Sequence, residues 1–296
     1  MNNAVPSGVG VALITPFNQD LSVDFAGLER LLELCIQGGV DYFVVNGTTA
    51  ENPTLTKEER YEILDFVLEK NSGSLPVVFG IGGNNTAAVA QEMAAFNVEG
   101  VSALLSASPY YNKPTQEGIY QHYKALSEAS ELPIILYNVP GRTSSNISAE
   151  TTLRLANDFE NVVAIKEASG NLDQITEIVL GRPDGFKIIS GDDNLTFAML
   201  GLGCDGVISV SGQGVPEVFC KVYDEAASGN WTASKEAHLA LFNLTNLLFA
   251  EGNPAGIKAA LQHRGICGDT VRLPLVEASE GLKDALKSEL AGLNLL

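Results

Sequence analysis

The segment Val162-Val163-Ala164-Ile165-Lys166-Glu167-Ala168 places one lysine inside an apolar run rich in β-branched residues. Such a run predicts a buried strand, and lysine is rarely buried without a partner or a chemical use. Desolvation disfavours the ammonium form, so a buried amine can attack a ketone and form a Schiff base. In the alternative interpretation, Lys166 reaches water at the strand end or pairs with Glu167, although neighbouring strand residues point to opposite faces. The pattern alone leaves both interpretations open.

Other residues with useful chemistry also follow apolar runs. Gly47-Thr48-Thr49 offers closely spaced backbone N–H groups and two hydroxyls, which suit a small carboxylate, although an ordinary turn has the same composition. Tyr137 ends an aliphatic run, where its phenol transfers protons or simply fills the core. Arg142 lies on a Pro-Gly loop and could bind a second carboxylate, whereas most single loop arginines are solvated. These residues predict a site for a small carboxylate-bearing substrate.

Two other segments resemble ligand sites but carry weaker signals. Asp192 and Asp193 follow a glycine, and two adjacent acids there most simply cap the next helix, so we expect no metal. Gly80-Ile81-Gly82-Gly83-Asn84-Asn85-Thr86 is rich in glycine but lacks the Lys-Ser/Thr ending of a nucleotide-binding loop. Neither segment therefore predicts a metal or nucleotide site.

Short apolar runs recur along the chain and are nearly continuous rather than alternating, as in parallel strands covered by helices. Eight runs are candidate strands: Val9 to Ile14, Tyr42 to Val45, Val77 to Ile81, Ser102 to Leu105, Ile134 to Tyr137, Val162 to Lys166, Lys187 to Ile189 and Gly206 to Val210. Helical patterns separate most of them, with Asp24 and Thr56 as helix starts and Gly38-Gly39 as the end of the first helix. The repeat predicts an α/β fold, a (β/α)8 TIM barrel, over an open doubly wound sheet, since no Gly-x-Gly-x-x-Gly turn follows the first run.

The last part of the chain has helical periodicity through Glu217 to Ala227, Thr232 to Phe249, Ala255 to His263 and Gly281 to Leu290. We therefore expect residues 1–214 to form the barrel that carries the active site. Residues 215–296 should supply the eighth barrel helix and a C-terminal helical appendage packed on the barrel. In such barrels the carboxyl ends of the strands face one shared mouth, where the residues with useful chemistry would gather.

Composition limits the possible partners. The formal net charge is −18, with 18 Lys and Arg against 36 Asp and Glu, so binding to nucleic acid is electrostatically opposed. The 4 cysteines lie far apart, which favours reduced thiols in a cytoplasm over disulfides or a zinc site. The N-terminal residues lack a secretory pattern, and no apolar stretch is long enough to span a bilayer. We expect a cytoplasmic protein without nucleic-acid or membrane partners.

Four motifs together carry a family resemblance: Gly47-Thr48-Thr49-Ala50-Glu51, Pro109-Tyr110-Tyr111-Asn112-Lys113-Pro114, Tyr137-Asn138-Val139-Pro140-Gly141-Arg142-Thr143 and Ile165-Lys166-Glu167-Ala168. With them the chain resembles the dihydrodipicolinate synthase / N-acetylneuraminate lyase family of pyruvate-dependent class I aldolases. The resemblance runs from about Gly8 to a closing signature, Asn253-Pro254 with Lys258 and then Arg272-Leu273-Pro274-Leu275.

The resemblance implies that Lys166 forms a Schiff base with pyruvate and that no cofactor or metal is needed. The enamine would attack L-aspartate 4-semialdehyde, and the product would cyclise as its amine displaces Lys166, a step of diaminopimelate and lysine biosynthesis. By the same match, Tyr137 carries protons, and Thr49 relays them between Tyr137 and Tyr111. The implied substrate-binding residues are Thr48 and Thr49 for the pyruvate carboxylate, Arg142 for the semialdehyde carboxylate, and Gly191 and Ile208 lining the pocket.

Two other functions stay open. Sister aldolases that cleave N-acetylneuraminate or 2-keto-3-deoxygluconate share the lysine and the tyrosine but generally lack the arginine matched here by Arg142. A non-catalytic barrel that binds pyruvate would have little need for the four predicted catalytic residues Lys166, Tyr137, Thr49 and Tyr111 together. The resemblance also implies a homo-oligomer, a tight dimer or a tetramer of two dimers, in which Tyr111 reaches the site of the neighbouring subunit.

A departure from the family pattern bears on regulation. Relatives that are inhibited by lysine use a glutamate at the position of Ala88, and here that carboxylate is missing. Lys57 and Arg60 stand where relatives often carry histidines, so a lysine ammonium would meet positive charge. Asn84 and Tyr110 still match the lysine pocket. We expect a degenerate allosteric site with weak or absent feedback inhibition.

Overall fold

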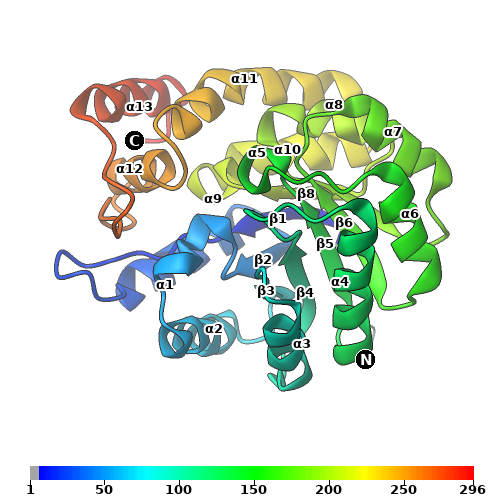
Figure 1. Cartoon of the computed structure of the whole chain (residues 1–296). Coiled ribbons are helices and arrows are strands. Elements are labelled where there is room, and N and C mark those ends of the chain that lie inside the picture. The colour runs from blue at the N-terminus through cyan, green and yellow to red at the C-terminus, as the bar shows by residue number, and fades with distance from the viewer. Residues whose placement is uncertain (1–6) are drawn as a thin grey trace. The chain divides into compact units, whose positions relative to one another are not determined.

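The computed structural model describes residues 7–296, and Figure 1 labels its helices and strands. Within these residues the strands follow chain order around a closed barrel, and the paired strands run parallel. The strands are β1 (Gly8–Ala12), β2 (Tyr42–Val45), β3 (Val77–Gly80), β4 (Val101–Ala107), β5 (Ile134–Asn138), β6 (Val162–Glu167), β7 (Lys187–Ser190) and β8 (Gly206–Ser209). A helix follows each strand, so the predicted (β/α)8 barrel is confirmed.

The helices account for most of the remaining described chain. The α-helices are α1 (Phe25–Gln37), α2 (Lys57–Asn71), α3 (Thr86–Ala94), α4 (Gln116–Ala129), α5 (Pro140–Thr143), α6 (Ala149–Asp158), α7 (Leu172–Gly181), α8 (Thr196–Gly201), α9 (Ser211–Gly214), α10 (Pro216–Ala227), α11 (Trp231–Phe249), α12 (Ala255–His263) and α13 (Glu280–Gly292). Three 3-10 helices are η1 (Thr48–Ala50), η2 (Asn52–Thr54) and η3 (Asp193–Leu195). The predicted C-terminal helices are therefore present as α10 to α13.

Local sequence explains where the first long helices begin and end. The Asp24 side chain accepts a hydrogen bond from the backbone N–H of Gly27 and caps α1. Thr56 and Glu59 form a reciprocal capping box at the start of α2. At the other end of α1, Gly39 adopts a positive φ of 86°, a conformation that glycine takes without steric cost. The predicted starts at Asp24 and Thr56 and the predicted stop at Gly38-Gly39 are confirmed.

The chain divides into two compact units. Unit 1 contains Pro76–Ile208 and the described residues up to Gly8, and in it α3, α4, α6 and α7 pack against one another in chain order (Figure 1). Unit 2 contains Val9–Leu75 and Ser209–Leu296, where α11 packs against α10, α12 and α13. The boundary predicted between residues 214 and 215 falls between α9 and α10 and stays a prediction.

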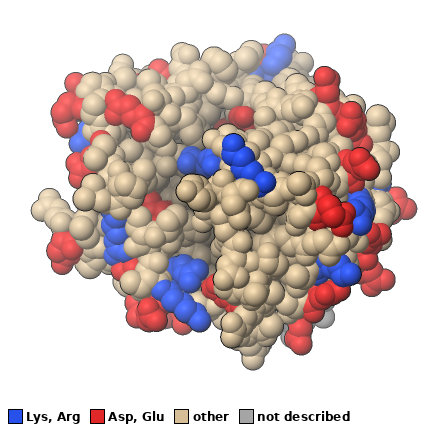
Figure 2. Space-filling model, viewed as in Figure 1, with Lys and Arg blue, Asp and Glu red and all other residues tan. Residues whose placement is uncertain are grey.

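The charged side chains at the surface reflect the acidic composition of the chain. Figure 2 shows acidic side chains mainly around the rim of the visible face and basic side chains in small groups, some of them near its middle. No helix in residues 7–296 combines the length and the apolar composition needed to cross a membrane. The cysteines at positions 35, 204, 220 and 267 are all buried and free.

Candidate active site

Lys166 is the centre of the candidate site in unit 1. It is the fifth residue of β6, where it lies opposite Tyr137 of β5 and Ile189 of β7 in the strand register. Only 6% of the residue is exposed, and its Nζ lies 4.4 Å from the centre of the Tyr137 ring. The interpretation that Lys166 extends into water is therefore wrong. A buried amine beside a phenol is an arrangement suited to covalent and proton-transfer chemistry.

Glu167 faces other polar groups and does not neutralise Lys166. Its fully buried carboxylate accepts hydrogen bonds from Nδ2 of Asn138 at 3.0 Å, Nε2 of Gln174 at 3.0 Å and the backbone N–H of Ser169 at 2.8 Å. Burial raises the pKa of Glu167, and the hydrogen bonds from Asn138, Ser169 and Gln174 oppose that rise. The alternative in which Glu167 serves as the ion-pair partner of Lys166 is therefore not supported.

The polar cluster around Glu167 was missed by sequence reasoning. Asn138 also donates to Asn146 at 2.8 Å, and the Asn146 amide donates to Gln174 at 2.8 Å, so the cluster joins β5, β6, α7 and the segment before α6. The only sequence signal for it is the placement of Asn138 directly after Tyr137 and of Glu167 directly after Lys166. Each chemically active residue is thus followed by one that anchors its strand on the opposite face.

Gly191, which the resemblance implies to line the pocket, lies against Lys166. A Cβ atom at this position would come within 3.0 Å of Cε of Lys166 and within 2.8 Å of Cβ of Ala168, so a larger residue would displace the lysine. The backbone N–H of Gly191 donates to the carbonyl of Glu167 at 2.8 Å and holds the loop there. Ile208, the other predicted lining residue, is buried in β8.

Arg142 and Tyr111 are exposed. Arg142 lies in the single turn of α5, after β5. Tyr111 is 89% exposed and adopts a positive φ of 64°, which is unusual for an aromatic residue. The loop that carries it is held by Asn84, whose Oδ1 accepts from the backbone N–H of Tyr110 at 3.0 Å and whose Nδ2 donates to the Tyr110 carbonyl. The loop therefore presents an aromatic side chain to the outside of unit 1.

Asp192 accepts the backbone N–H of Asn194 and caps η3, as its position after Gly191 predicted. Burial raises the pKa of Asp192, with the neighbouring charge of Asp193 acting in the same direction. In the part of the chain that the structure describes, no three His, Cys, Asp or Glu residues gather in a way that could hold a metal ion.

Unit 2 carries Thr48 and Thr49 on η1, immediately after β2. Thr49 is buried, with 3% of the residue exposed, and its Oγ1 accepts a hydrogen bond from Nδ2 of Asn253 at 2.9 Å. Thr48 is half-buried. The hydroxyl of Thr15 donates to the carbonyl of Ala50 at 2.9 Å and ties the other end of this short turn to the segment after β1. The predicted pair of threonines therefore lies on a well-anchored turn.

An ion pair lies directly behind this turn. Nζ of Lys258 lies 2.5 Å from Oε1 of Glu51, both side chains are fully buried, and Lys258 also donates to the Thr270 carbonyl at 2.8 Å. Oε2 of Glu51 accepts the backbone N–H of Arg272 at 2.9 Å. Burial lowers the pKa of Lys258, and the charge of Glu51 opposes that shift.

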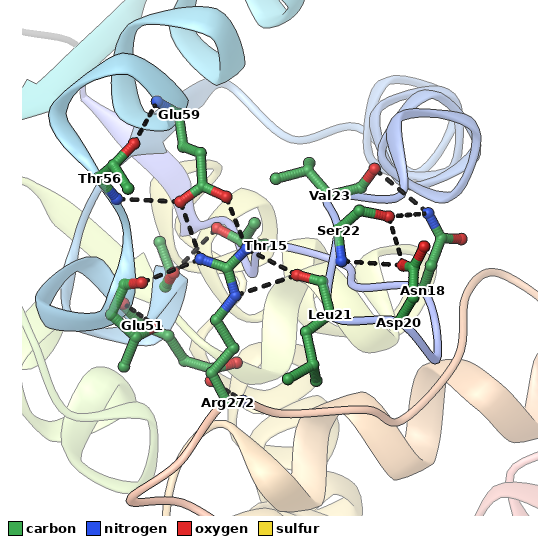
Figure 3. A network of polar contacts seen from close by, with 12 residues as sticks. Thr15, Asn18, Asp20, Leu21, Ser22, Val23, Glu51, Thr56, Glu59 and Arg272 are labelled. Carbon is green, nitrogen blue, oxygen red and sulfur yellow. Dashed lines mark hydrogen bonds and ion pairs between the residues drawn. The ribbon is translucent and has the colours of Figure 1, made fainter.

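Arg272 extends this cluster from Glu51 to Glu59 (Figure 3). Its guanidinium donates to both carboxylate oxygens of Glu59, at 2.6 and 2.8 Å, and to the carbonyls of Leu21 and Thr54. The hydrogen bond from Arg272 lowers the pKa of Glu59. The Phe17 ring centre lies 4.3 Å from both Nζ of Lys258 and the guanidinium carbon. Sequence reasoning noted Lys258 and Arg272 only as parts of a family signature.

The residues of the predicted allosteric site are also divided between the units. In unit 1, Ala88 is exposed on the first turn of α3, and Asn84 is bonded to Tyr110 as described above. In unit 2, Lys57 and Arg60 lie on the first turn of α2, with Nζ of Lys57 at 5.9 Å from the Tyr61 ring centre. The predicted weak response to lysine stays a prediction.

The closed barrel and the buried lysine near the end of β6 define the class of the protein, a (β/α)8 barrel whose candidate site is centred on a buried amine. The model of the dihydrodipicolinate synthetase family matches residues 5–292, and the chain belongs to this family. The family resemblance predicted from the sequence motifs is thereby confirmed.

Individual relatives agree with this assignment. The chain is 51% identical over 269 residues to the 4-hydroxy-tetrahydrodipicolinate synthase of Parabacteroides distasonis, covering 91% of each chain. It is similar to the crystal structure of dihydrodipicolinate synthase from Thermotoga maritima, with a TM-score of 0.95, 42% identity and coverage of 98% and 99%. It is also similar to the chloride-inhibited dihydrodipicolinate synthase from Acinetobacter baumannii complexed with pyruvate, with a TM-score of 0.94, 37% identity and coverage of 98% and 99%.

Proposed function

We propose that the chain catalyses the condensation of pyruvate with L-aspartate 4-semialdehyde, the 4-hydroxy-tetrahydrodipicolinate synthase reaction of the diaminopimelate and lysine pathway. The observation that carries this proposal is the buried amine of Lys166, 4.4 Å from the Tyr137 ring centre and in contact with Gly191. The names of the similar proteins support the reaction, and the pyruvate complex of the Acinetobacter baumannii relative supports the first substrate.

Lys166 is the nucleophile of the proposed reaction. Its Nζ adds to C2 of pyruvate, the resulting carbinolamine loses water, and an imine forms. The imine withdraws electrons from the methyl group, which loses a proton and becomes the enamine carbon. That carbon attacks the aldehyde of the semialdehyde, whose oxygen takes up a proton. The amino group of the acceptor then adds to the imine carbon and displaces Lys166, so the lysine is free for another cycle.

The remaining predicted residues bind the substrates or carry protons. Tyr137 moves protons at the imine, and Thr49 passes them between Tyr137 and Tyr111. Thr48 and Thr49 hold the pyruvate carboxylate through hydroxyl and backbone N–H groups. Arg142 binds the carboxylate of the semialdehyde, while Gly191 and Ile208 line the pocket. In this mechanism the covalent Schiff base takes the place of a cofactor or a metal, so activity should survive dialysis against a chelator.

Borohydride trapping tests the first step. Reduction of the enzyme in the presence of pyruvate should add the mass of one reduced pyruvate to the peptide that contains Lys166, and Lys166→Ala should abolish the label. Lys187→Ala changes a lysine on the neighbouring strand β7 and should leave the label in place. Labelling that persists in Lys166→Ala would contradict the proposed nucleophile.

The choice of acceptor depends on Arg142. Because its guanidinium would bind the second carboxylate, Arg142→Ala should raise the KM for the semialdehyde far more than the KM for pyruvate. Equal effects on both constants would remove the reason for this acceptor. N-acetylneuraminate and 2-keto-3-deoxygluconate should be offered to the wild-type enzyme in parallel, since turnover of only a sugar acid would favour a sister aldolase.

We also propose a homo-oligomer, a tight dimer or a tetramer of two dimers, in which Tyr111 completes the site of the neighbouring subunit. The 89% exposure of Tyr111 supports this, since an aromatic side chain held out by a pinned loop is suited to an interface. A mixture of Tyr111→Phe and Lys166→Ala subunits, both inactive alone, should regain activity, because each hybrid dimer combines an intact Lys166 with an intact Tyr111. Lack of recovery in proven hybrids would place Tyr111 in its own subunit's site.

The proposed location is the cytoplasm. The four cysteines are free, and burial raises the pKa of the Cys204, Cys220 and Cys267 thiols to about 12, so they hold little reactive thiolate. Reduced, inert thiols suit a reducing compartment. Fractionation of cells that produce the protein at native level would test the location.

A further inference from the structure

The hydroxyl of Thr49 is held by a residue 204 positions further along the chain. Nδ2 of Asn253 lies 2.9 Å from Oγ1 of Thr49, and both residues are buried, with 8% and 3% exposed. An amide N–H only donates, so in this contact Oγ1 is the acceptor. The Thr49 hydroxyl therefore keeps its own proton free to be donated in a direction away from Asn253.

The carbonyl oxygen of the Asn253 side chain provides a second observation. Its Oδ1 atom is buried and has no hydrogen-bond partner among the described residues. A buried carbonyl oxygen without a partner costs free energy, and in a native protein it calls for an explanation such as a catalytic role or a bound water. This atom is therefore a second indication that the amide of Asn253 belongs to a functional site.

The C-terminal segment that carries Asn253 contacts the turn that carries Thr49 at more than one point. Two residues after Thr49, Glu51 accepts Lys258 and the backbone N–H of Arg272. These buried contacts fix the turn, so the Asn253 amide meets the Thr49 hydroxyl without relying on a flexible loop. The position of a predicted catalytic hydroxyl is thus set by residues from α12 and its flanking segments.

We propose that Asn253 is a positioning residue that sets the direction of proton transfer at Thr49. By donating to Oγ1, Asn253 leaves the Thr49 proton pointing away from the amide, and Thr49 acts as a donor in the proposed relay. The proposal rests on the proposed function, because it assigns a role only within that proton relay. The opposite orientation of the Asn253 amide would make Thr49 donate to Oδ1 and would remove its proton from the relay.

The substitution Asn253→Asp separates these two cases. Aspartate has the same shape but only accepts, so in the proposed arrangement Thr49 must donate to the new carboxylate and the relay is broken. With the opposite amide orientation, aspartate would preserve the original hydrogen bond. Asn253→Ala removes the donor without adding a charge and should have a smaller effect, because the hydroxyl remains free to donate.

The readout is the exchange of pyruvate methyl protons for deuterium in D2O, followed by NMR without an acceptor. This exchange reports proton transfer at the imine, and borohydride trapping reports imine formation separately. We expect Asn253→Asp to slow exchange on the order of tenfold to a hundredfold, with trapping of pyruvate near the wild-type extent. In a Thr49→Val background, adding Asn253→Asp should change exchange little, since both substitutions interrupt the same step.

Several outcomes would overturn the inference. Exchange at the wild-type rate in an Asn253→Asp enzyme that still traps pyruvate would show that Asn253 does not donate to Thr49. Parallel loss of trapping, exchange and thermal stability would assign Asn253 a purely structural role. Additive effects of Asn253→Asp and Thr49→Val would separate the two residues. A wild-type enzyme that traps no pyruvate would instead refute the proposed function, and with it the relay.

Discussion

Replacing Lys258 with methionine removes one charge of the buried Lys258–Glu51 pair while keeping most of the volume of the side chain. The structure sets the expected size of the effect, because both side chains are fully buried and their charged atoms lie 2.5 Å apart. The Glu51 carboxylate would keep the backbone N–H of Arg272 as a donor but lose its counter-charge. Removing one partner of such a pair typically costs about 3–5 kcal/mol, and we expect a loss of that order in the free energy of unfolding.

A double-mutant cycle separates the pair from its surroundings. Glu51→Gln leaves Lys258 without its partner, but burial already lowers the pKa of Lys258, so the lysine can lose its proton and the loss should be smaller. The double variant Glu51→Gln with Lys258→Met buries no unpaired charge. We therefore expect the two single losses to sum to about 2 kcal/mol more than the loss in the double variant.

Urea unfolding monitored by tryptophan fluorescence is a suitable assay. The chain has 1 tryptophan, Trp231, at the start of α11, and both Trp231 and the ion pair belong to unit 2. The matched control is Lys124→Met, which removes a lysine whose 4.0 Å pair with Glu128 is exposed, and it should change the midpoint little. This reasoning would be refuted if the urea midpoint of Lys258→Met were as close to that of the wild type as the midpoint of the control. It would also be refuted if the stability losses of the two single variants simply added up to that of the double variant.

Three further predictions concern other groups. Glu167→Gln should lower the urea midpoint, with a loss of about 1–3 kcal/mol, because the new amide nitrogen would face donors that now point at a carboxylate. Burial lowers the pKa of His122 to about 4, from about 6.5 in the unfolded chain. The neutral imidazole therefore contributes its full stability above about pH 6.5. About 3 kcal/mol of the free energy of unfolding is lost as the pH falls from there to about 4. Urea unfolding between pH 4 and 8 should show this loss in the wild type and a shallower slope in His122→Gln. Submillimolar lysine should inhibit the wild type little, and Ala88→Glu should increase inhibition in the coupled condensation assay, whereas strong wild-type inhibition would refute a degenerate site.

The sequence predicted the elements well because their signals are local. Continuous β-branched runs located the strands, including β6 around Lys166, and single capping residues located the starts of α1 and α2. These predictions of strands and helix starts depend on residues within one run or at one helix end. The family resemblance implied that Gly191 lines the pocket, and the structure places Gly191 against the side chain of Lys166.

The partners of the buried polar residues could not be predicted in the same way. Asn138 and Glu167 are separated by 29 residues, Thr49 and Asn253 by 204, and Glu51 and Lys258 by 207. A single sequence contains no pattern that pairs such positions. Their pairing follows only from the fold. The fold brings β5 beside β6 in unit 1, and it brings the turn after β2 beside the C-terminal segment in unit 2.

The predicted catalytic residues are divided between the two compact units, and each unit supports its share with a separate polar cluster. In unit 1 the Glu167 cluster anchors the strands that carry Lys166 and Tyr137. In unit 2 the C-terminal segment anchors the turn that carries Thr49. A disturbance of the unit 2 cluster should therefore affect steps that depend on the Thr49 hydroxyl before it affects imine formation at Lys166. In the proposed relay the segment between α11 and α12, which carries Asn253, then belongs to the catalytic apparatus, because it sets which way the Thr49 hydroxyl donates its proton.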